Sequence, residues 1–304
     1  MELRHLRYFV TVAEELHFTR AAERLHIGQP PLSQQIQALE AELGVTLLER
    51  TRRQVKLTEA GKHFLARAKQ ILAAAQTARD EAVRVAQGEA GELRIAFTSS
   101  LPLTHFMPSA LRAYRLAYPD VRLILAEMFT VRQFDALLED RLDIGFVRYS
   151  GSTPPEGISL HEIRRDPLIL FVNQHHRLAK ATSVGIADLR HEDFVAYPRS
   201  VGPGLVEQLY HLCGAEGFTP RVVQEVSEAT TQIGLVAAGL GLAILPSPLE
   251  CVRVDGVRHI PIRDEGAHLS LGIAVAQARR SPQIEKFLAV VQAIEHAESA
   301  SPQS

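Results

Sequence analysis

Hydrophobic side chains near the N-terminus recur at helical spacing in three successive segments. They would share one face of each helix: Leu3, Leu6, Phe9, Val10 and Ala13 in the first, Phe18, Ala21, Ala22 and Leu25 in the second, and Leu32, Ile36 and Leu39 in the third. Thr19 is placed to cap the second helix. Pro30 and Pro31 should open the third, because proline is tolerated in a first turn, and Gly44 should end it.

A basic hairpin is expected directly after these helices. The stretch "LLERTRRQVKLT" (47–58) predicts two short strands around a turn that carries Arg50, Arg52 and Arg53. Helix, turn, helix and basic hairpin together predict a winged helix-turn-helix domain over residues 1–58.

A long helix is predicted next, over residues 59–88. Its apolar residues alternate in steps of four and three, which is a heptad pattern, at Phe64, Ala68, Ile71, Ala75, Ala78, Ala82 and Val85. We interpret the helix as a dimerising linker, because an alanine-rich face brings helices close together. The alternative is a helix that packs on its own domain.

Short apolar runs then alternate with helical segments from residue 89 to the C-terminus. Strand, helix, strand, helix, strand is the order through "LRIAF", "VRLILAE" and "DIGFV", which predicts a parallel sheet. The pattern continues through further strands to a last helix near residues 282–297. We expect two α/β lobes, one formed by residues 89–162 and 268–304 and the other by 163–267, with the chain crossing between them near 159–164 and 267–270.

Composition narrows the class of protein. Of 304 residues, 46% are hydrophobic and 22% charged, which is typical of a globular protein. The charged start of the chain and the lack of a membrane-length apolar run argue against secretion and membrane partners, and two cysteines suit a reducing cytoplasm. Net charge is −2, but residues 1–70 hold 11 Lys and Arg against 8 Asp and Glu. The basic excess lies where the winged helix is predicted.

The polar face of the third helix suggests double-stranded DNA as a partner. Gln and Ser both donate and accept hydrogen bonds, so they can distinguish bases in the major groove, which the start of this helix enters in helix-turn-helix proteins. The candidate DNA-binding residues are Thr19, Gln29, Pro30, Pro31, Ser33, Gln34, Gln37, Arg50, Arg52 and Arg53. The arginines would neutralise phosphates or enter the minor groove. The alternative is an ordinary solvated helix face beside a solvated loop.

These residues also carry a family resemblance. The stretch from "LRHLRYFV" to "GKHFL" (3–65), and above all "FTRAAERLHIGQPPLSQQIQALEAELGVTLLER", resembles the N-terminal domain of LysR-type transcriptional regulators. "QPPLSQQI" and "DIGFVR" are most similar to the branch that senses muconates and benzoate. The resemblance implies a dimer of dimers, RNA polymerase as a partner, and an effector domain of two Rossmann-like lobes like periplasmic binding proteins, with the ligand in the cleft between them.

The candidate effector site follows from where strands end. Ligands of open α/β lobes bind beyond the carboxyl ends of strands, often at helix N-termini. Those positions, with the loop 198–204 expected to close the cleft, give Thr98, Ser99, Ser100, Thr104, Phe129, Thr130, Arg148, Val201, Gly202 and Pro203. By the resemblance, Ser100 (or Ser99, one position away), Thr130 and Arg148 hold an effector carboxylate. The Ser and Thr residues could instead be helix caps, and Arg148 a solvated charge.

With Phe129 and Val201 in it, the cleft is expected to prefer a ligand of different shape from the family's best-known ligands. Signals for other kinds of site are weak. His175 and His176 lack companion ligands with the spacing of a metal site, and "GLGLAI" (239–244) follows a helix, whereas a dinucleotide-binding loop follows a strand. Cys213 and Cys251 are far apart in sequence, which does not support redox sensing. We therefore expect no metal, no cofactor and no enzyme activity. The interpretation is a cytoplasmic DNA-binding transcription regulator with an anionic aromatic or dicarboxylate effector; the alternatives are a non-aromatic effector, a solute-binding protein or an α/β-cleft enzyme.

Overall fold

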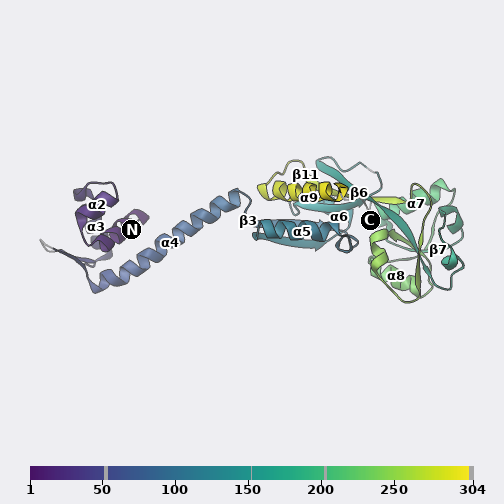
Figure 1. The fold of residues 1–304 in the computed structure, drawn as a ribbon, viewed down its shortest axis with the longest axis horizontal. Coiled ribbons are helices and arrows are strands. Elements are labelled where there is room, and N and C mark those ends of the chain that lie inside the picture. The colour runs from purple at the N-terminus through teal and green to yellow at the C-terminus, as the bar shows by residue number, and fades with distance from the viewer. Residues whose placement is uncertain (51–53, 152, 202–203, 301–304) are drawn as a thin grey trace. The chain divides into compact units, whose positions relative to one another are not determined.

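The computed structural model describes residues 1–50, 54–151, 153–201 and 204–300, with side chains described to residue 297. The chain divides into two compact units, Met1–Arg84 and Val85–Ser304. Figure 1 shows the elements of each unit in chain order. The predicted fold class is confirmed: helices and a small hairpin come first, then a long helix, then a two-lobed α/β region.

The N-terminal unit is a winged helix-turn-helix. Helices α1 (Leu3–Glu15), α2 (Phe18–Arg24) and α3 (Gln29–Leu43) pack together, and strands β1 (Leu48–Arg50) and β2 (Val55–Leu57) pair antiparallel beside them. The core holds most of the apolar positions that the spacing predicts, whereas Leu3 is 48% exposed. Its fully buried members include Leu6, Phe9, Val12, Ala21, Leu32, Ile36 and Leu39.

Helix ends in this unit agree with the sequence pattern with one exception. Helix α3 has its prolines in the first turn and ends at Gly44, whose φ of +70° is the left-handed conformation that glycine adopts without strain. The prediction for Thr19 was wrong. His17 caps α2 instead, because its Nδ1 accepts a hydrogen bond from the backbone N–H of Arg20, while Thr19 lies exposed within the first turn.

Helix α4 spans Glu59–Ala86, and its two ends have different surroundings. Near its start, Ala68 is fully buried and Phe64 packs edge-to-face on Phe9 with ring centroids 5.2 Å apart. Farther along, Ile71 and Val85 are exposed at 40% and 42%. The first turns of the heptad face therefore pack on their own unit, which agrees with the alternative interpretation. The later turns present an apolar face to solvent.

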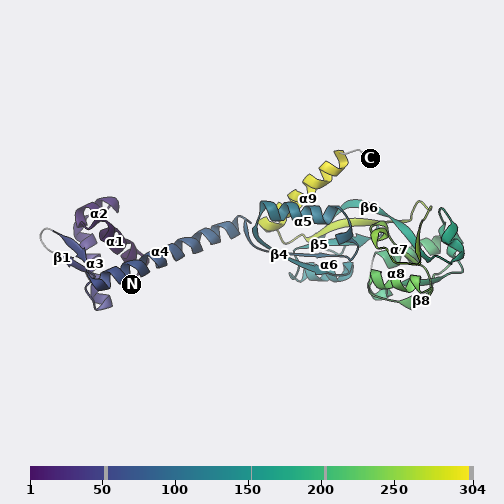
Figure 2. The same cartoon turned by 60° about the horizontal axis from the view of Figure 1, so that its bottom comes forward.

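The first lobe is built on parallel strands. Strand β3 (Ala90–Phe97) lies between β4 (Asp120–Glu127) and β5 (Ile144–Tyr149), and both pairings are parallel, as predicted. Helices α5 (Phe106–Ala117) and α9 (Pro282–Ala300) cover one face, and α6 (Thr130–Leu138) covers the other, as Figure 2 shows. Between α5 and α9, the rings of Tyr114 and Phe287 are tilted to each other with centroids 5.2 Å apart. The C-terminal helix thus completes the first lobe.

Two long strands carry the chain between the lobes. Strand β6 (Ile158–Asn173) pairs antiparallel with β11 (His268–Ala276) through its first part, and with β9 (Ala243–Pro246) and β10 (Val257–Pro261) through its last. The segment 159–164, where a crossing was expected, lies inside one continuous strand. One seven-stranded sheet consequently runs through both lobes.

The second lobe adds two parallel strands and two helices. Strands β7 (Asp193–Ala196) and β8 (Arg221–Glu225) pair with each other, and a bridge from Phe194 to Leu242 joins them to the chain next to β9. Helices α7 (Leu205–Ala215) and α8 (Ala229–Ala237) complete the lobe. The sequence analysis did not predict β10.

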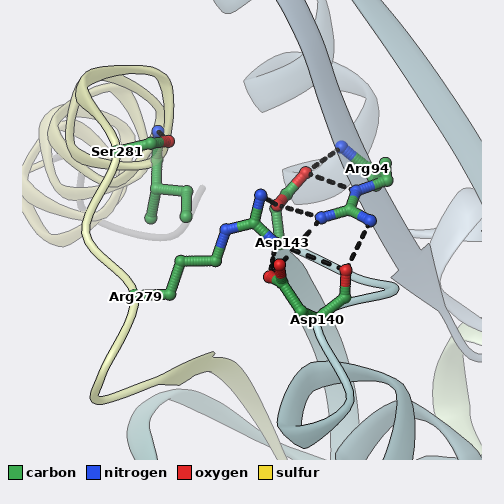
Figure 3. A network of polar contacts seen from close by, with 6 residues as sticks. Arg94, Asp140, Asp143, Arg279 and Ser281 are labelled. Carbon is green, nitrogen blue, oxygen red and sulfur yellow. Dashed lines mark hydrogen bonds and ion pairs between the residues drawn. The ribbon is translucent and has the colours of Figure 1, made fainter.

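Ion pairs fix the segment after β11 to the first lobe. Figure 3 shows Arg94, Asp140, Asp143 and Arg279 in contact. Arg94 donates to both oxygens of Asp143, at 3.1 Å from Nε and 2.9 Å from Nη2, and Nη2 of Arg279 lies 3.2 Å from the same carboxylate. This network joins β3, the start of β5 and the entry to α9. Within the described ranges, no helix is long and apolar enough to cross a membrane.

Candidate DNA-binding face and effector cleft

The start of α3 presents a neutral polar surface. Gln29, Pro30, Pro31, Gln34 and Gln37 are exposed, whereas Leu32, Ile36 and Leu39 on the opposite face are fully buried. Ser33 is half-buried. The helix therefore separates core-facing apolar side chains from amides that are free to approach another molecule.

Hydrogen bonds and an ion pair join α3 to the wing, which is the hairpin of β1 and β2. The Glu40 carboxylate accepts backbone hydrogen bonds from Leu47 at 2.8 Å and Leu48 at 3.0 Å, and its other oxygen lies 2.8 Å from Nη2 of Arg50. Nη1 of Arg50 also donates to Ser33 Oγ, at 3.2 Å, and its guanidinium lies over the Phe18 ring. Arg50 and Ser33 thus hold the hairpin against the helix, a role that the sequence interpretation did not include. Arg52 and Arg53 lie outside the described residues.

The effector cleft lies between the two lobes of the second unit. A cavity of about 350 Å³ is lined in the first lobe by residues that follow β3, by the end of β4 and the start of α6, and by Arg148 of β5. In the second lobe, residues that follow β7, begin α7 or precede α8 line it. That volume is within the range of small-ligand sites. Of the predicted effector residues, those that line it are Thr98, Ser99, Ser100, Phe129, Thr130, Arg148 and Val201.

Arg148 is the buried cation of this cleft. It is 4% exposed, so it is not a solvated charge. Nε donates to Ser100 Oγ at 2.9 Å, and Nη1 lies 2.6 Å from Oδ2 of Asp166. Burial lowers the pKa of Arg148, and the charge of Asp166 acts in the opposite direction. Nη2 is buried without a hydrogen-bond partner in the described part of the chain, so the guanidinium has donor capacity for a ligand.

The backbone of Arg148 is held by the neighbouring elements. Thr130, at the first position of α6, donates through Oγ1 to the Arg148 carbonyl at 3.0 Å and accepts from the Arg148 N–H at 3.2 Å. Gly204 packs against that carbonyl from the other lobe: a Cβ there would lie 2.9 Å from the oxygen, and its φ of +134° also favours glycine. The Thr130 hydroxyl is thus already hydrogen-bonded to β5. What α6 can offer an anion is therefore the backbone N–H groups at its N-terminus.

Aromatic side chains bridge the two lobes across the cleft. Tyr197, after β7, lies edge-to-face with Phe129, with ring centroids 5.6 Å apart, and Ser99 acts on the pKa of its hydroxyl from the first lobe. Burial raises the pKa of Tyr197 to about 12. The phenol is therefore neutral at physiological pH and is a hydrogen-bond donor beside the cavity.

Three predicted effector residues are not placed in the cleft. Thr104 accepts from the Met107 N–H and donates to the Leu101 carbonyl, so its hydroxyl satisfies the turn before α5, one residue ahead of the N-cap His105. Gly202 and Pro203 lie outside the described residues. Thr98, by contrast, lines the cavity, and its buried Oγ1 has no partner within the described ranges.

Sequence reasoning missed Glu127, Asp166, Tyr197 and Glu228. Glu127 ends β4 and Glu228 precedes α8, so the rule that ligands meet strand ends and helix starts could have found both. Tyr197 also follows a strand, β7. Asp166 is an isolated carboxylate within "RRDPLILF", where the strand turns apolar, and only the fold shows that it meets Arg148.

Other reactive groups in the described part of the chain do not assemble into a site. Its His, Cys, Asp and Glu side chains form no cluster of three that could hold a metal ion. His176 instead pairs with Glu192, at 3.0 Å. Cys213 is buried and Cys251 exposed, and both are free thiols.

Comparison with known proteins gives matches along almost the whole chain. The family model described as "LysR substrate binding domain" matches residues 86–294, and that described as "Bacterial regulatory helix-turn-helix protein, lysR family" matches residues 3–62. The transcriptional regulator YnfL of Escherichia coli is 49% identical over 88% of this chain and 89% of its own.

Two further relatives have solved structures. BenM of Acinetobacter baylyi is 38% identical over 97% of this chain and 96% of its own, and its effector-binding domain with benzoate matches 70% of this chain and 96% of that domain, with a TM-score of 0.61 and 29% identity. CbnR in complex with its target DNA covers 97% of this chain and 100% of CbnR, with a TM-score of 0.79 and 30% identity.

Proposed function

Because this chain belongs to the LysR family of bacterial transcription regulators, we propose that it binds operator DNA through α3 and the wing and responds to a small carboxylate in the cleft at Arg148. Residues 1–58 bind DNA, residues 59–88 pair two chains, and residues 89–304 bind the effector. The protein acts in the cytoplasm as a dimer of dimers and contacts RNA polymerase.

The amides of α3 support DNA recognition. Exposed Gln29, Gln34 and Gln37 reach base edges, and Ser33 with Arg50 sets the angle of the wing. CbnR, which matches this chain along its length, was solved with its target DNA. Amides discriminate between bases, whereas arginines add attraction that depends little on sequence.

The observation that carries the effector site is the buried guanidinium of Arg148. A cation 4% exposed, with a buried Nη2 that lacks a partner in the described ranges, favours an anion in the adjacent cavity. Ser100 and the N-terminus of α6 lie beside it. BenM binds benzoate in its effector domain, so aromatic monocarboxylates are the first class to test.

The response is a population shift between lobe arrangements. The cleft has Arg148 and Thr130 on one lobe and Tyr197 and Gly204 on the other, so a bound ligand contacts both. Strands β6 and β11 run through both lobes and transmit any change in their angle. A different angle between effector domains alters the spacing of the DNA-binding domains, and with it the bend of the operator.

A thermal-shift screen of purified protein against aromatic and dicarboxylic acids tests the effector proposal. A ligand at about 100 times its Kd adds about 2.7 kcal/mol to the free energy of unfolding. The proposal expects hits among carboxylates and a change in operator footprint with the same compounds. Hits confined to uncharged or cationic compounds would contradict it.

A further inference from the structure

The cleft differs in charge between its inner end and its mouth, and this bears on the chemical class of the effector. The inference rests on the proposed effector site at Arg148. Ser100, Arg148 and the start of α6 lie at the inner end, whereas Glu127, Arg132 and Glu228 line the exposed mouth.

The charged side chains at the inner end leave one positive charge that a ligand can neutralise. Asp166 lies 2.6 Å from Nη1 of Arg148 and 3.1 Å from Nε of Arg164. Two guanidinium groups thus face one carboxylate, which leaves one positive charge to be compensated. Nη2 of Arg148 and Oγ1 of Thr98 are buried donors that meet no partner among the described residues, and one ligand carboxylate has two oxygens for them.

The mouth brings together two carboxylates from different lobes. Glu127 is the last residue of β4 in the first lobe, and Glu228 precedes α8 in the second. Burial first, and then the charge of Glu228, raise the pKa of Glu127, so the negative charge of Glu228 disfavours ionisation of Glu127. The charges of both carboxylates also raise the pKa of Tyr197, which lies between the lobes. A second anionic group brought here would add to this repulsion.

We propose that the effector is a small monocarboxylate whose far end carries a cationic or hydrogen-bond-donating group, and that the cleft discriminates against dicarboxylates. The carboxylate binds Arg148, and the donor meets Glu127 and Glu228 at the mouth. A cation there relieves the repulsion between these two carboxylates, whereas a second carboxylate increases it.

Three ligands of one shape test this assignment by isothermal titration calorimetry on the full-length protein: 4-(aminomethyl)benzoate, benzoate and terephthalate. We expect 4-(aminomethyl)benzoate to bind about fivefold more tightly than terephthalate, the upper size expected for an exposed charge pair, with benzoate between them. In the double variant Glu127→Gln, Glu228→Gln, the three affinities should converge. Arg132→Gln, which removes an exposed charge from the same mouth, is the matched control and should keep the order.

Two results would overturn the ligand class while leaving the carboxylate site intact. One is terephthalate binding as tightly as 4-(aminomethyl)benzoate or more tightly, which would assign the mouth to Arg132. The other is an unchanged order of affinities in the double glutamine variant. Failure of all three ligands to bind the wild-type protein would overturn the proposed aromatic carboxylate site, and the ligand class with it.

Discussion

The Arg148 guanidinium lies 2.6 Å from the Asp166 carboxylate, and the two side chains are 5% and 8% exposed. Asp166 belongs to β6, the strand that runs from one lobe into the other, and Arg148 belongs to β5 in the first lobe. An anionic effector that binds Arg148 therefore acts on an ion pair whose acidic partner lies on the connecting strand.

Replacing Asp166 with Asn should lower stability and raise affinity for a carboxylate. The substitution leaves Arg148 and Arg164 without their shared counter-charge, and breaking one side of a buried ion pair typically costs about 3–5 kcal/mol. Benzoate then supplies the missing negative charge. Thermal unfolding with and without benzoate should show a lower Tm and a larger benzoate-induced increase than in the wild type.

Asp143→Asn is the matched control for this measurement. Asp143 is another buried carboxylate, 2.9 Å from Nη2 of Arg94, but it belongs to the network of Figure 3 and not to the cleft lining. It should lose stability without a larger benzoate effect. Equal benzoate shifts in the two variants would show that Asp166 does not compete with the ligand.

Gln34→Ala should reduce operator affinity while leaving affinity for random DNA nearly unchanged. An amide that recognises a base contributes to discrimination, about 1–3 kcal/mol for a bidentate pair, and little to phosphate attraction. Fluorescence anisotropy with operator and scrambled duplexes measures both affinities. Gln76→Ala, an exposed glutamine on α4, should change neither. A parallel loss on both duplexes would remove base recognition from Gln34.

Ala78→Glu should weaken self-association of the chain. Ala78 lies on the exposed part of the heptad face of α4, which includes Ile71 and Val85. A glutamate there brings a charge and a longer side chain into a close helix pair. Analytical ultracentrifugation should show a higher dimer dissociation constant than for Ala73→Glu, which changes an exposed alanine off that face. Identical values would place the dimer contact elsewhere.

Stability should fall with rising pH above about 10, partly through Tyr114. Burial raises the pKa of Tyr114 to about 12, whereas an unfolded tyrosine ionises near pH 10. The unfolded chain therefore loses this proton first. The contribution is fully present below about pH 10 and is lost as pH rises to about 12. Urea unfolding between pH 9 and 11 should show a shallower decline for Tyr114→Phe; an equal slope would be inconsistent with this assignment.

The sequence predicted those features that depend on local patterns. The apolar periodicity located α1 to α4, and Gly44 marked a helix end because a left-handed turn favours glycine. Thr19 was assigned the cap because Ser and Thr are common there, but His17 supplies the same kind of acceptor. Local pattern also could not show that the first turns of α4 pack against Phe9, since that contact joins distant segments.

The sequence predicted mainly the side of the cleft that follows the parallel strands, and Val201 on the other side. Ser100, Thr130 and Arg148 all follow that rule or lie at the end of β5. Asp166 was not predicted by this rule, because it contacts Arg148 only where β6 runs beside the first lobe. Tyr197 reaches Ser99 and Phe129 across the cleft, and such a contact depends on the angle between the lobes rather than on local sequence.

Calorimetric titration of benzoate into wild-type protein and Arg148→Gln tests whether Arg148 holds the effector carboxylate. We expect binding to the wild type, and at least about tenfold weaker binding to the variant, because a charge-assisted hydrogen bond is worth about 1.5–3 kcal/mol. Operator affinity without ligand should be the same for both proteins. Benzoate binding of equal strength to a folded Arg148→Gln protein would contradict the account.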